Sequence, residues 1–363
     1  MTDVRTAMIV GGGIAGPTAA IALQKAGIEA TVYEAHPAGA DAAGAFMTLG
    51  SNGIAALYVL GAADRVVERG FATPSINLRS YTGKSLGCAR IDASGNGDTP
   101  SHTLKRTDLY QSIRDEAVER GIHIAYGRRL VDAVDEAGSV RATFADGSTA
   151  TADVLVGCDG VHSTVRRLID PNAPSPAYAG LIGTGGYTGD IAVETEPGAY
   201  EMIFGKRAFL GYVTAPDGEV WWFANVPRAA EPARGEAEAE SMQAWRDRLQ
   251  ALYADDAGPG RELVDATESI LPMSPIHTLA RLPHWHRGRM VVIGDAAHAP
   301  SPSSGQGASL SVEDAIVLAK SLRDAPDVST AMDRFETSRR PRVEKIIRQA
   351  ARVNSSKAAG PIA

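Results

Sequence analysis

Short apolar runs and stretches with helical spacing alternate near the start of the chain. Residues 6–10 form an apolar run as long as a buried strand, and apolar residues recur at helical spacing over 17–26. Gly27 stands where a helix would end, and residues 30–33 form a second strand-like run. Together they predict a β-α-β unit, the building block of a parallel sheet with crossover helices.

The same alternation of strands and helices continues in the middle of the chain and returns near its end. Turn residues separate the runs, and the pattern is typical of an α/β framework. The expected elements are a helix over 107–120, a strand over 122–125, a hairpin starting at 140–144 and turning at Asp146 and Gly147, buried strands over 153–157 and 290–293, and a helix after Gly307.

A different pattern lies between these framework elements. Residues 187–227 carry longer runs with a period of two, and we expect strands at 200–204, 209–213 and 220–226. A polar segment rich in Ala and Glu follows and predicts a helix over 231–252. The chain is therefore expected to insert an antiparallel sheet into its α/β framework.

Charge and cysteine content narrow the possible functions. The 36 basic and 43 acidic residues give a net charge of -7 and are spread along the chain, so nothing indicates a nucleic-acid partner. The N-terminal residues lack the basic segment and long apolar core of a signal or membrane span, and we expect a cytoplasmic protein. Cys88 and Cys158 have no neighbouring ligands, so no metal site is expected.

A glycine-rich turn follows the first predicted strand. Gly11, Gly13 and Gly16 fit a pattern in which the glycines allow a tight turn, an approach of backbone to a pyrophosphate and close packing of helix on strand. Glu34 closes the next strand, where a carboxylate can accept hydrogen bonds from a ribose. The unit predicts a dinucleotide site but does not separate FAD from NAD.

A second strand-to-helix loop, 289–307, favours a flavin. Gly294 allows close approach of the chain, and Asp295 offers a carboxylate to a ribityl-like hydroxyl chain. The N–H groups at 305–307 begin a helix, and their partial positive charge suits a ring that becomes anionic when reduced. A nicotinamide has no such need.

A third strand and glycine turn, 154–166, contains the sequence Cys158-Asp159-Gly160. In this order the three segments resemble the class A flavoprotein monooxygenases, the family of p-hydroxybenzoate hydroxylase, with their GxGxxG, DG and GD motifs. Residues 104–109 are similar to the family's R-x-x-L helix start, and residues 335–342 to its C-terminal helix.

The resemblance implies a Rossmann-like FAD-binding domain of the p-hydroxybenzoate hydroxylase (GR2) type, with an inserted antiparallel-sheet substrate domain and a C-terminal helix. The FAD-binding domain would comprise 1–73, 101–180 and 271–363, and the substrate domain 74–100 and 181–270. Pro302 would lie beside the isoalloxazine. The residues expected to contact FAD are Gly11, Gly13, Ile14, Ala15, Gly16, Glu34, Ala35, Arg106, Asp159, Gly160, Gly294, Asp295, Pro302, Gly305, Gln306, Gly307 and Ala308.

Aromatic residues of the inserted sheet are candidates to line the substrate pocket. Alternation places Trp221, Phe223 and Asn225 on one face and Trp222, Ala224 and Val226 on the other, and the sequence leaves open which face looks inward. The further candidates are Met202, Phe204 and Tyr212.

Two groups of charged residues are expected to be structural. His298 is expected to orient backbone or pack beneath its loop rather than act as a base. Arg339, Arg340 and Arg342 are expected to form a solvated helix face.

The resemblance implies a reaction as well as a fold. NAD(P)H would reduce FAD, O2 would form a flavin C4a-hydroperoxide, and an aromatic or polyketide-like small molecule would receive an oxygen atom. The protein is expected to be a monomer or a homodimer. Residues 222–227 lack the second tryptophan of the halogenase W-x-W-x-I-P segment, which disfavours halogenation. A flavin oxidase or reductase, or a non-catalytic nucleotide-binding module, remains an alternative.

Overall fold

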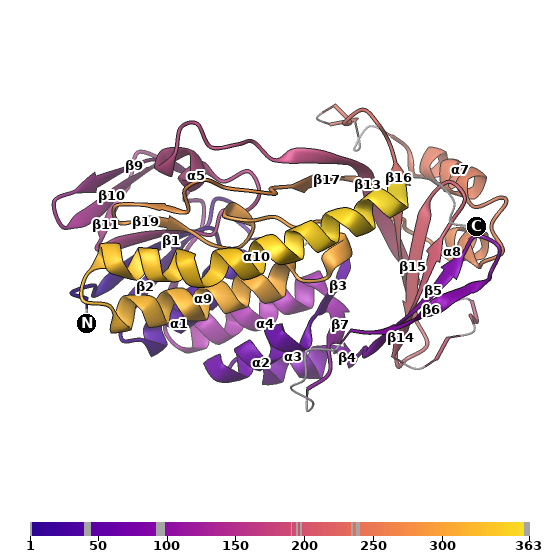
Figure 1. The fold of residues 1–363 in the computed structure, drawn as a ribbon, viewed down its shortest axis with the longest axis horizontal. Coiled ribbons are helices and arrows are strands. Elements are labelled where there is room, and N and C mark those ends of the chain that lie inside the picture. Colours follow the sequence, from indigo (N-terminus) through magenta and orange to yellow (C-terminus); the bar gives the residue numbers. More distant parts are fainter. Residues whose placement is uncertain are drawn as a thin grey trace.

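A computed structural model describes residues 2–39, 45–91, 99–189, 191–193, 195–196, 198–233, 235–236 and 240–358. Two sheets lie side by side along the long axis of the molecule (Figure 1). The first carries the glycine-rich loops, and the second is the inserted sheet. A long helix, α10 (Val328–Ala358), runs from the first half toward the second and lies against two strands of the inserted sheet.

The first sheet has six strands and is parallel except at one edge. Its apolar strands are buried because helices or strands cover both faces, which explains their near-continuous apolar runs. In spatial order the strands are β18 (His286–Arg287), β19 (Met290–Val292), β12 (Val154–Gly157), β1 (Thr6–Val10), β2 (Glu29–Tyr33) and β8 (His123–Ala125), and only β18 is antiparallel to its neighbour.

Helices and a small sheet cover this parallel sheet. The predicted β-α-β unit is confirmed, with α1 (Ala15–Lys25) ending before Gly27, whose φ of +82° is left-handed. The other covering elements are α4 (Arg106–Glu119), α5 (Thr164–Ile169), α9 (Gly307–Asp324) and the strands β9 (Leu130–Glu136), β10 (Ser139–Phe144) and β11 (Thr149–Ala152). Outside them, α2 (Ser51–Leu60) packs on α9 and α3 (Asp64–Arg69) on α4.

The inserted sheet has seven strands. All neighbouring pairs are antiparallel except β14 (Ala199–Phe204) with β5 (Ser75–Ser80), which are parallel and come from distant parts of the chain. In spatial order the strands are β17 (Ser274–Thr278), β13 (Ala177–Thr188), β16 (Val220–Pro227), β15 (Phe209–Thr214), β14 (Ala199–Phe204), β5 (Ser75–Ser80) and β6 (Ser85–Arg90).

One face of this sheet is covered by two helices, α7 (Met242–Leu252) and α8 (Gly260–Ala266). The expected helix over 231–252 is therefore too long at its start. Residues 231–233 are not helical, positions 234 and 237–239 lie outside the described residues, and the Ser241 hydroxyl caps α7 by accepting a hydrogen bond from the Ala244 N–H.

A small three-stranded sheet joins the two halves. Its strands are β3 (Phe46–Leu49), β7 (His102–Lys105) and β4 (Phe71–Ala72), and side chains from it pack on the other face of the inserted sheet. Two short 3-10 helices, η1 (Gly294–Ala296) and η2 (Pro302–Ser304), lie between β19 and α9. None of the helices in the described part of the chain is long and apolar enough to cross a bilayer.

Candidate active site

The glycine turn between β1 and α1 is held by close backbone contacts. Gly11 has a φ of +106°, and a Cβ there would lie 2.4 Å from the Cys158 carbonyl oxygen. A Cβ on Gly16 would lie 1.9 Å from the Gly11 oxygen. At Gly13, by contrast, a Cβ would meet nothing within 4 Å. The turn therefore leaves an open space at the start of α1, where Ile14 is the N-cap and free N–H groups favour an anion.

Glu34 lies where β2 ends and is buried beside this turn. Its Oε2 accepts a hydrogen bond of 2.6 Å from the Gly12 N–H, and its Oε1 accepts one of 2.7 Å from the His36 N–H. These bonds fix the carboxylate, yet each oxygen has a second acceptor position. Glu34 can therefore hold a ribose hydroxyl, with Ala35 half-buried next to it.

Asp159 follows β12 and stabilises the start of α5. Its carboxylate accepts hydrogen bonds from the Ser163 hydroxyl at 2.5 Å and the Thr164 N–H at 2.6 Å, while burial raises its pKa. Gly160, with a φ of +76°, leaves the space beside it open. Asp159 thus shapes the loop between β12 and α5, and the open side of that loop is at Gly160.

Asp295 in η1 presents its carboxylate to solvent. Gly294 before it has a φ of +56°, and a Cβ there would lie 2.6 Å from the Ser311 hydroxyl. Surrounding protein raises the pKa of Asp295, and the charges of His298 and Arg106 oppose that shift. The exposed guanidinium of Arg106, at the start of α4, makes no hydrogen bond to any described residue. Both groups are available to a ligand.

The loop from η2 to α9 ends in a helix N-terminus. Pro302 is exposed, Gly305 has a φ of +60° with nothing within 4 Å of its Cβ position, and Gln306 is the N-cap of α9. The first N–H groups of α9, around Gly307 and Ala308, have no partner within the helix. An anionic ring edge would be stabilised there.

A buried ionic network lies directly beneath η1. Asp314 of α9 accepts hydrogen bonds from the Gly294 N–H at 3.0 Å, the His298 ring at 2.6 Å and the Arg339 guanidinium at 2.7 Å. These partners hold the pKa of Asp314 below its ordinary value despite burial. His298 thus packs beneath its loop as expected. Glu313 extends the network, since it also binds Arg339.

The expectation that three arginines of α10 form a solvated face is wrong for Arg339. Its side chain is 5% exposed because it reaches both Glu313 and Asp314. Arg340 is also partly covered and bonds to Glu336 and to the Leu282 carbonyl oxygen. Only Arg342 is largely exposed, with Glu313 as its partner. A charge pattern alone could not reveal the acidic pair on α9.

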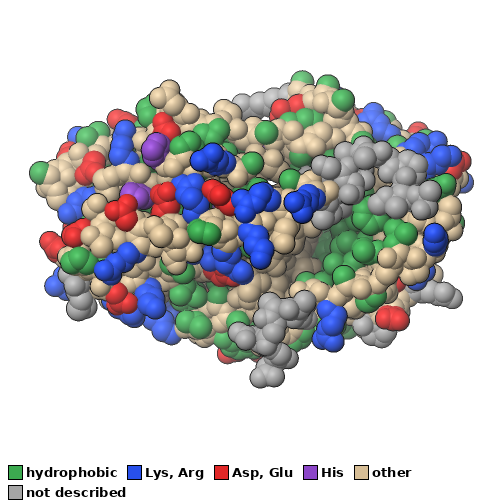
Figure 2. Space-filling view, in the orientation of Figure 1, with side chains coloured by type: hydrophobic (Ala, Val, Ile, Leu, Met, Phe, Trp, Pro, Cys, Tyr) green, Lys and Arg blue, Asp and Glu red, His purple; other side chains and the backbone are tan. Residues whose placement is uncertain are grey.

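The face of the inserted sheet that looks toward the half with the glycine-rich loops is aromatic. Trp221 and Phe223 lie on it with Tyr200 and Met202, and Phe46 of β3 packs against them. Figure 2 shows hydrophobic side chains gathered in a hollow beside the end of α10 and over this sheet. By the same alternation and register, Phe204 and Asn225 point to this face. The facing that the sequence left open is thus decided.

Tyr212 is the exception among the substrate candidates. It packs with Trp222, Ala224 and Val226 in the cluster covered by α7 and α8, on the far face of the sheet. The prediction that Tyr212 lines the pocket is therefore wrong, because residue 212 alternates with Gly211 and Val213 and so faces away from Trp221.

The sequence did not indicate the hydroxyl cluster at one end of the aromatic face. The Tyr200 hydroxyl lies 3.0 Å from Thr48 Oγ1 and 3.1 Å from Thr103 Oγ1. Burial raises the pKa of Tyr200 to about 12. Alternation within β3 and β7 could have placed the threonines on one face, but their contact with β14 depends on tertiary packing.

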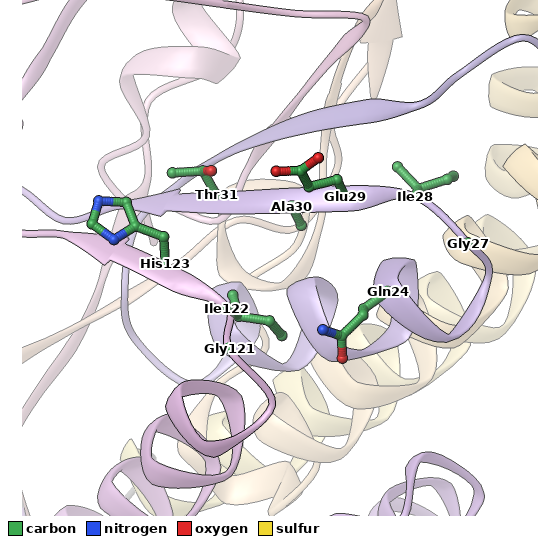
Figure 3. Close-up of a pocket in the computed structure, with 9 residues that line it drawn as sticks. All are labelled: Gln24, Gly27, Ile28, Glu29, Ala30, Thr31, Gly121, Ile122 and His123. Atoms are coloured by element: carbon green, nitrogen blue, oxygen red, sulfur yellow. The ribbon is translucent and has the colours of Figure 1, made fainter.

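Two cavities differ in their relation to these loops. One, of about 380 Å³, lies between η2, α2 and α10, with Ser303, Ser304 and Gln306 in its wall. The other, of about 230 Å³, lies around Glu29 and His123, where β2 begins (Figure 3). The first borders the predicted flavin loop, whereas the second lies at the opposite end of β2 from Glu34.

The three glycine loops, with a fixed glutamate at one end and an exposed aspartate at the other, define an FAD-binding α/β fold. The open spaces at Gly13, Gly160 and Gly305 fit an extended dinucleotide. The family model described as an FAD binding domain matches residues 3–350. The chain belongs to this family, that of the class A flavoprotein monooxygenases, and FAD is its cofactor.

Similar proteins span nearly the whole chain. An FAD-dependent urate hydroxylase of Klebsiella pneumoniae is 29% identical over 353 residues, which cover 95% of this chain and 88% of that protein. A 2-heptyl-3-hydroxy-4(1H)-quinolone synthase of Pseudomonas aeruginosa is 31% identical, with 95% and 87% covered. The crystal structure of Klebsiella pneumoniae HpxO with FAD and uric acid is 25% identical, with a TM-score of 0.85 and 99% and 90% covered.

Proposed function

We propose that this protein uses NAD(P)H and O2 to hydroxylate a planar aromatic small molecule. The observation that carries the proposal is the aromatic face of Trp221, Phe223 and Met202, which looks toward the half that holds the flavin loops. The names of two relatives, a urate hydroxylase and a quinolone synthase, also concern planar heteroaromatic rings.

The cofactor is proposed to lie across the three loops. Gly11, Gly13, Gly16 and Glu34, with Ile14, Ala15 and Ala35 beside them, would hold the ADP half. Arg106, Gly294 and Asp295 would hold the ribityl and pyrophosphate region, with Asp159 and Gly160 shaping the adjacent loop. The isoalloxazine would lie at Pro302, Gly305, Gln306, Gly307 and Ala308.

Bound FAD would supply the electron transfer from the nicotinamide and the activation of O2. The protein contributes position and environment. The N-terminus of α9 stabilises negative charge at the ring edge, and the aromatic face excludes water from the reacting atoms. One oxygen atom enters the substrate, and the other leaves as water with the two electrons of NAD(P)H.

Labelled oxygen tests the reaction. Purified FAD-bound protein is given NAD(P)H, ¹⁸O2 and a set of planar aromatic compounds, and nicotinamide oxidation and product mass are measured. Substrate-stimulated oxidation with one ¹⁸O in the product supports the proposal. Stimulated oxidation without label in the product indicates an oxidase or reductase, and no oxidation with any compound indicates a non-catalytic module.

A further inference from the structure

On the five central strands of the inserted sheet, the described residues that face the glycine-rich loops include no ionisable side chain except tyrosines. By the pairing register, the residues of this face are Gly183, Gly185, Tyr187, Trp221, Phe223, Asn225, Phe209, Gly211, Val213, Tyr200, Met202, Phe204, Ile76, Leu78 and Ser80. Burial raises the pKa of Tyr187 and Tyr200 to about 12, so both phenols are neutral near pH 7.

The nearest charges stand at one end of this face and neutralise each other. Lys105 Nζ lies 3.5 Å from the Glu219 carboxylate and 4.7 Å from the centre of the Tyr187 ring. The Trp221 indole N–H also donates to Glu219. An anionic substrate such as a benzoate would therefore find no free cation on this face, and desolvating its charge would be unfavourable.

Glycines make part of the face low enough for a flat ring. Gly183 is half-exposed, and a Cβ there would have only ordinary contacts, the nearest 3.7 Å from the Ser274 oxygen. Gly211, by contrast, is buried under the Phe223 ring. On β14, the side chains of Met202 and Phe204 are also partly accessible. These positions leave parts of the face accessible to a flat ring.

Asn225 is the amide in this otherwise apolar region. The residue is 5% exposed, and its side chain makes no hydrogen bond to any residue in the described part of the chain. Its cross-strand neighbours are Gly183 and Phe209, neither of which has a polar side chain. The Asn225 amide oxygen and nitrogen are not among the fully enclosed polar atoms of the described residues, so their unused hydrogen-bonding positions are open to a ligand.

A primary amide presents a donor and an acceptor side by side. A cyclic amide, or lactam, presents the complementary pair of C=O and N–H on one edge. We propose that Asn225 recognises the substrate through hydrogen bonds, and that the substrate is an uncharged planar heteroaromatic lactam bound through its C=O and N–H edge. This inference rests on the proposed function. A phenolate or carboxylate only accepts hydrogen bonds, so it could bind the amide N–H2 group but not the amide C=O.

Binding to the oxidised FAD holoenzyme tests this directly, without NAD(P)H. The probes are quinolin-2(1H)-one, its N-methyl derivative, which lacks the N–H donor, and 2-naphthoate, a flat anion of similar size. Affinity is measured from the change in flavin absorbance on titration. We expect wild-type protein to bind quinolin-2(1H)-one about tenfold or more tightly than either other probe. Loss of one buried hydrogen bond to the lactam N–H would account for a difference of this size.

The variant Asn225→Leu should remove this preference. The variant's affinity for quinolin-2(1H)-one should fall about tenfold, because no side-chain partner remains for the N–H. The variant should then bind quinolin-2(1H)-one and the N-methyl derivative equally. Met202→Leu is the matched control on the same face, and it should shift both lactams alike and keep their ratio. Asn225→Ala, which cannot clash, repeats the test, and FAD content and melting temperature verify folding.

Three results would overturn the inference. One is equal or tighter binding of 2-naphthoate by the wild-type protein. Another is an Asn225→Leu variant that keeps the preference for the N–H lactam. The third is loss of FAD affinity in both Asn225 variants, which would place the amide on the cofactor. These titrations involve no turnover, so their outcome is independent of the ¹⁸O experiment. The lactam inference can fail while ¹⁸O enters a product, and it can hold when no ¹⁸O is incorporated.

Discussion

The two sides of the candidate active site differ in which atoms form their surface. On the cofactor side, backbone forms the surface, and glycines such as Gly11 and Gly16 are required because a Cβ would strike a carbonyl oxygen. On the sheet side, side chains such as Phe223 and Met202 form the surface, and several residue types would fit the backbone. The cofactor side is therefore suited to a ligand that stays the same, FAD. On the sheet side, residues can be substituted without changing the fold.

The sharpest test of this comparison contrasts two glycines of the same turn. Gly16→Ala should destabilise the protein by about 3 kcal/mol or more and abolish FAD binding, because its Cβ would lie 1.9 Å from the Gly11 oxygen. Gly13→Ala should leave the stability of the FAD-free protein unchanged yet weaken FAD binding about tenfold or more. Urea unfolding and fluorescence titration with FAD measure both. Normal FAD affinity in Gly13→Ala would mean that the pyrophosphate does not lie there.

The network beneath η1 shows that the cofactor side also depends on side chains at one point. Arg339→Met should lower the free energy of unfolding by about 3–5 kcal/mol, because it leaves the fully buried Asp314 carboxylate without its guanidinium partner, whereas Glu313 keeps Arg342. Arg348→Met is the control, since Arg348 is 67% exposed and 3.7 Å from Glu344; its effect should stay within about 0.5 kcal/mol. Equal effects in denaturant unfolding would contradict the structural role of Arg339.

Trp222 and Phe223 are adjacent on β16 but face opposite sides of the sheet. Substitution of the first should affect mainly protein stability, and substitution of the second mainly substrate specificity. Trp222→Leu should cost about 2–4 kcal/mol, because Trp222 is fully buried and its indole N–H donates to the Thr267 hydroxyl at 2.8 Å. Phe223→Leu should cost about 1 kcal/mol but change KM for aromatic substrates. The comparison fails if Trp222→Leu alters the order of substrate preference and Phe223→Leu does not.

The smallest expected effect concerns Asp295 and pH. Protein around it raises its pKa, so folding favours the protonated carboxyl. The protein without FAD therefore loses stability as pH rises from the ordinary pKa of 3.8 through the folded value. Asp295→Asn should raise the melting temperature of the FAD-free protein slightly at pH 7, with the difference shrinking toward pH 4, and should weaken FAD binding. A lower melting temperature at pH 7 would show that the carboxylate stabilises the fold.

The elements that sequence predicted best are those that backbone geometry dictates. The strand at residues 6–10, the helix after Gly307 and the turn at Gly27 were placed within a few residues, because apolar period and glycine position specify them locally. The same holds for the loop glycines of the cofactor side. Steric demands on a backbone are visible in the sequence.

The residues that sequence missed or misplaced depend on contacts between distant segments. The burial of Arg339 requires Glu313 and Asp314 on another helix, and the Tyr200 hydroxyl meets Thr103 across two sheets. Tyr212 was misplaced because alternation gives the relative facing of residues within a strand, but only packing against α7 and α8 decides which face is covered.

The parallel pairing of β5 with β14 has a consequence for how such a protein can change. Ser75 lies opposite Ala199, although the strands between them along the chain belong largely to the other half. The chain therefore crosses between the halves more than once, and no single cut would release either as a portable module. New substrate range in this architecture is expected to arise from replacement of individual side chains on the sheet, in place, rather than from exchange of a whole unit.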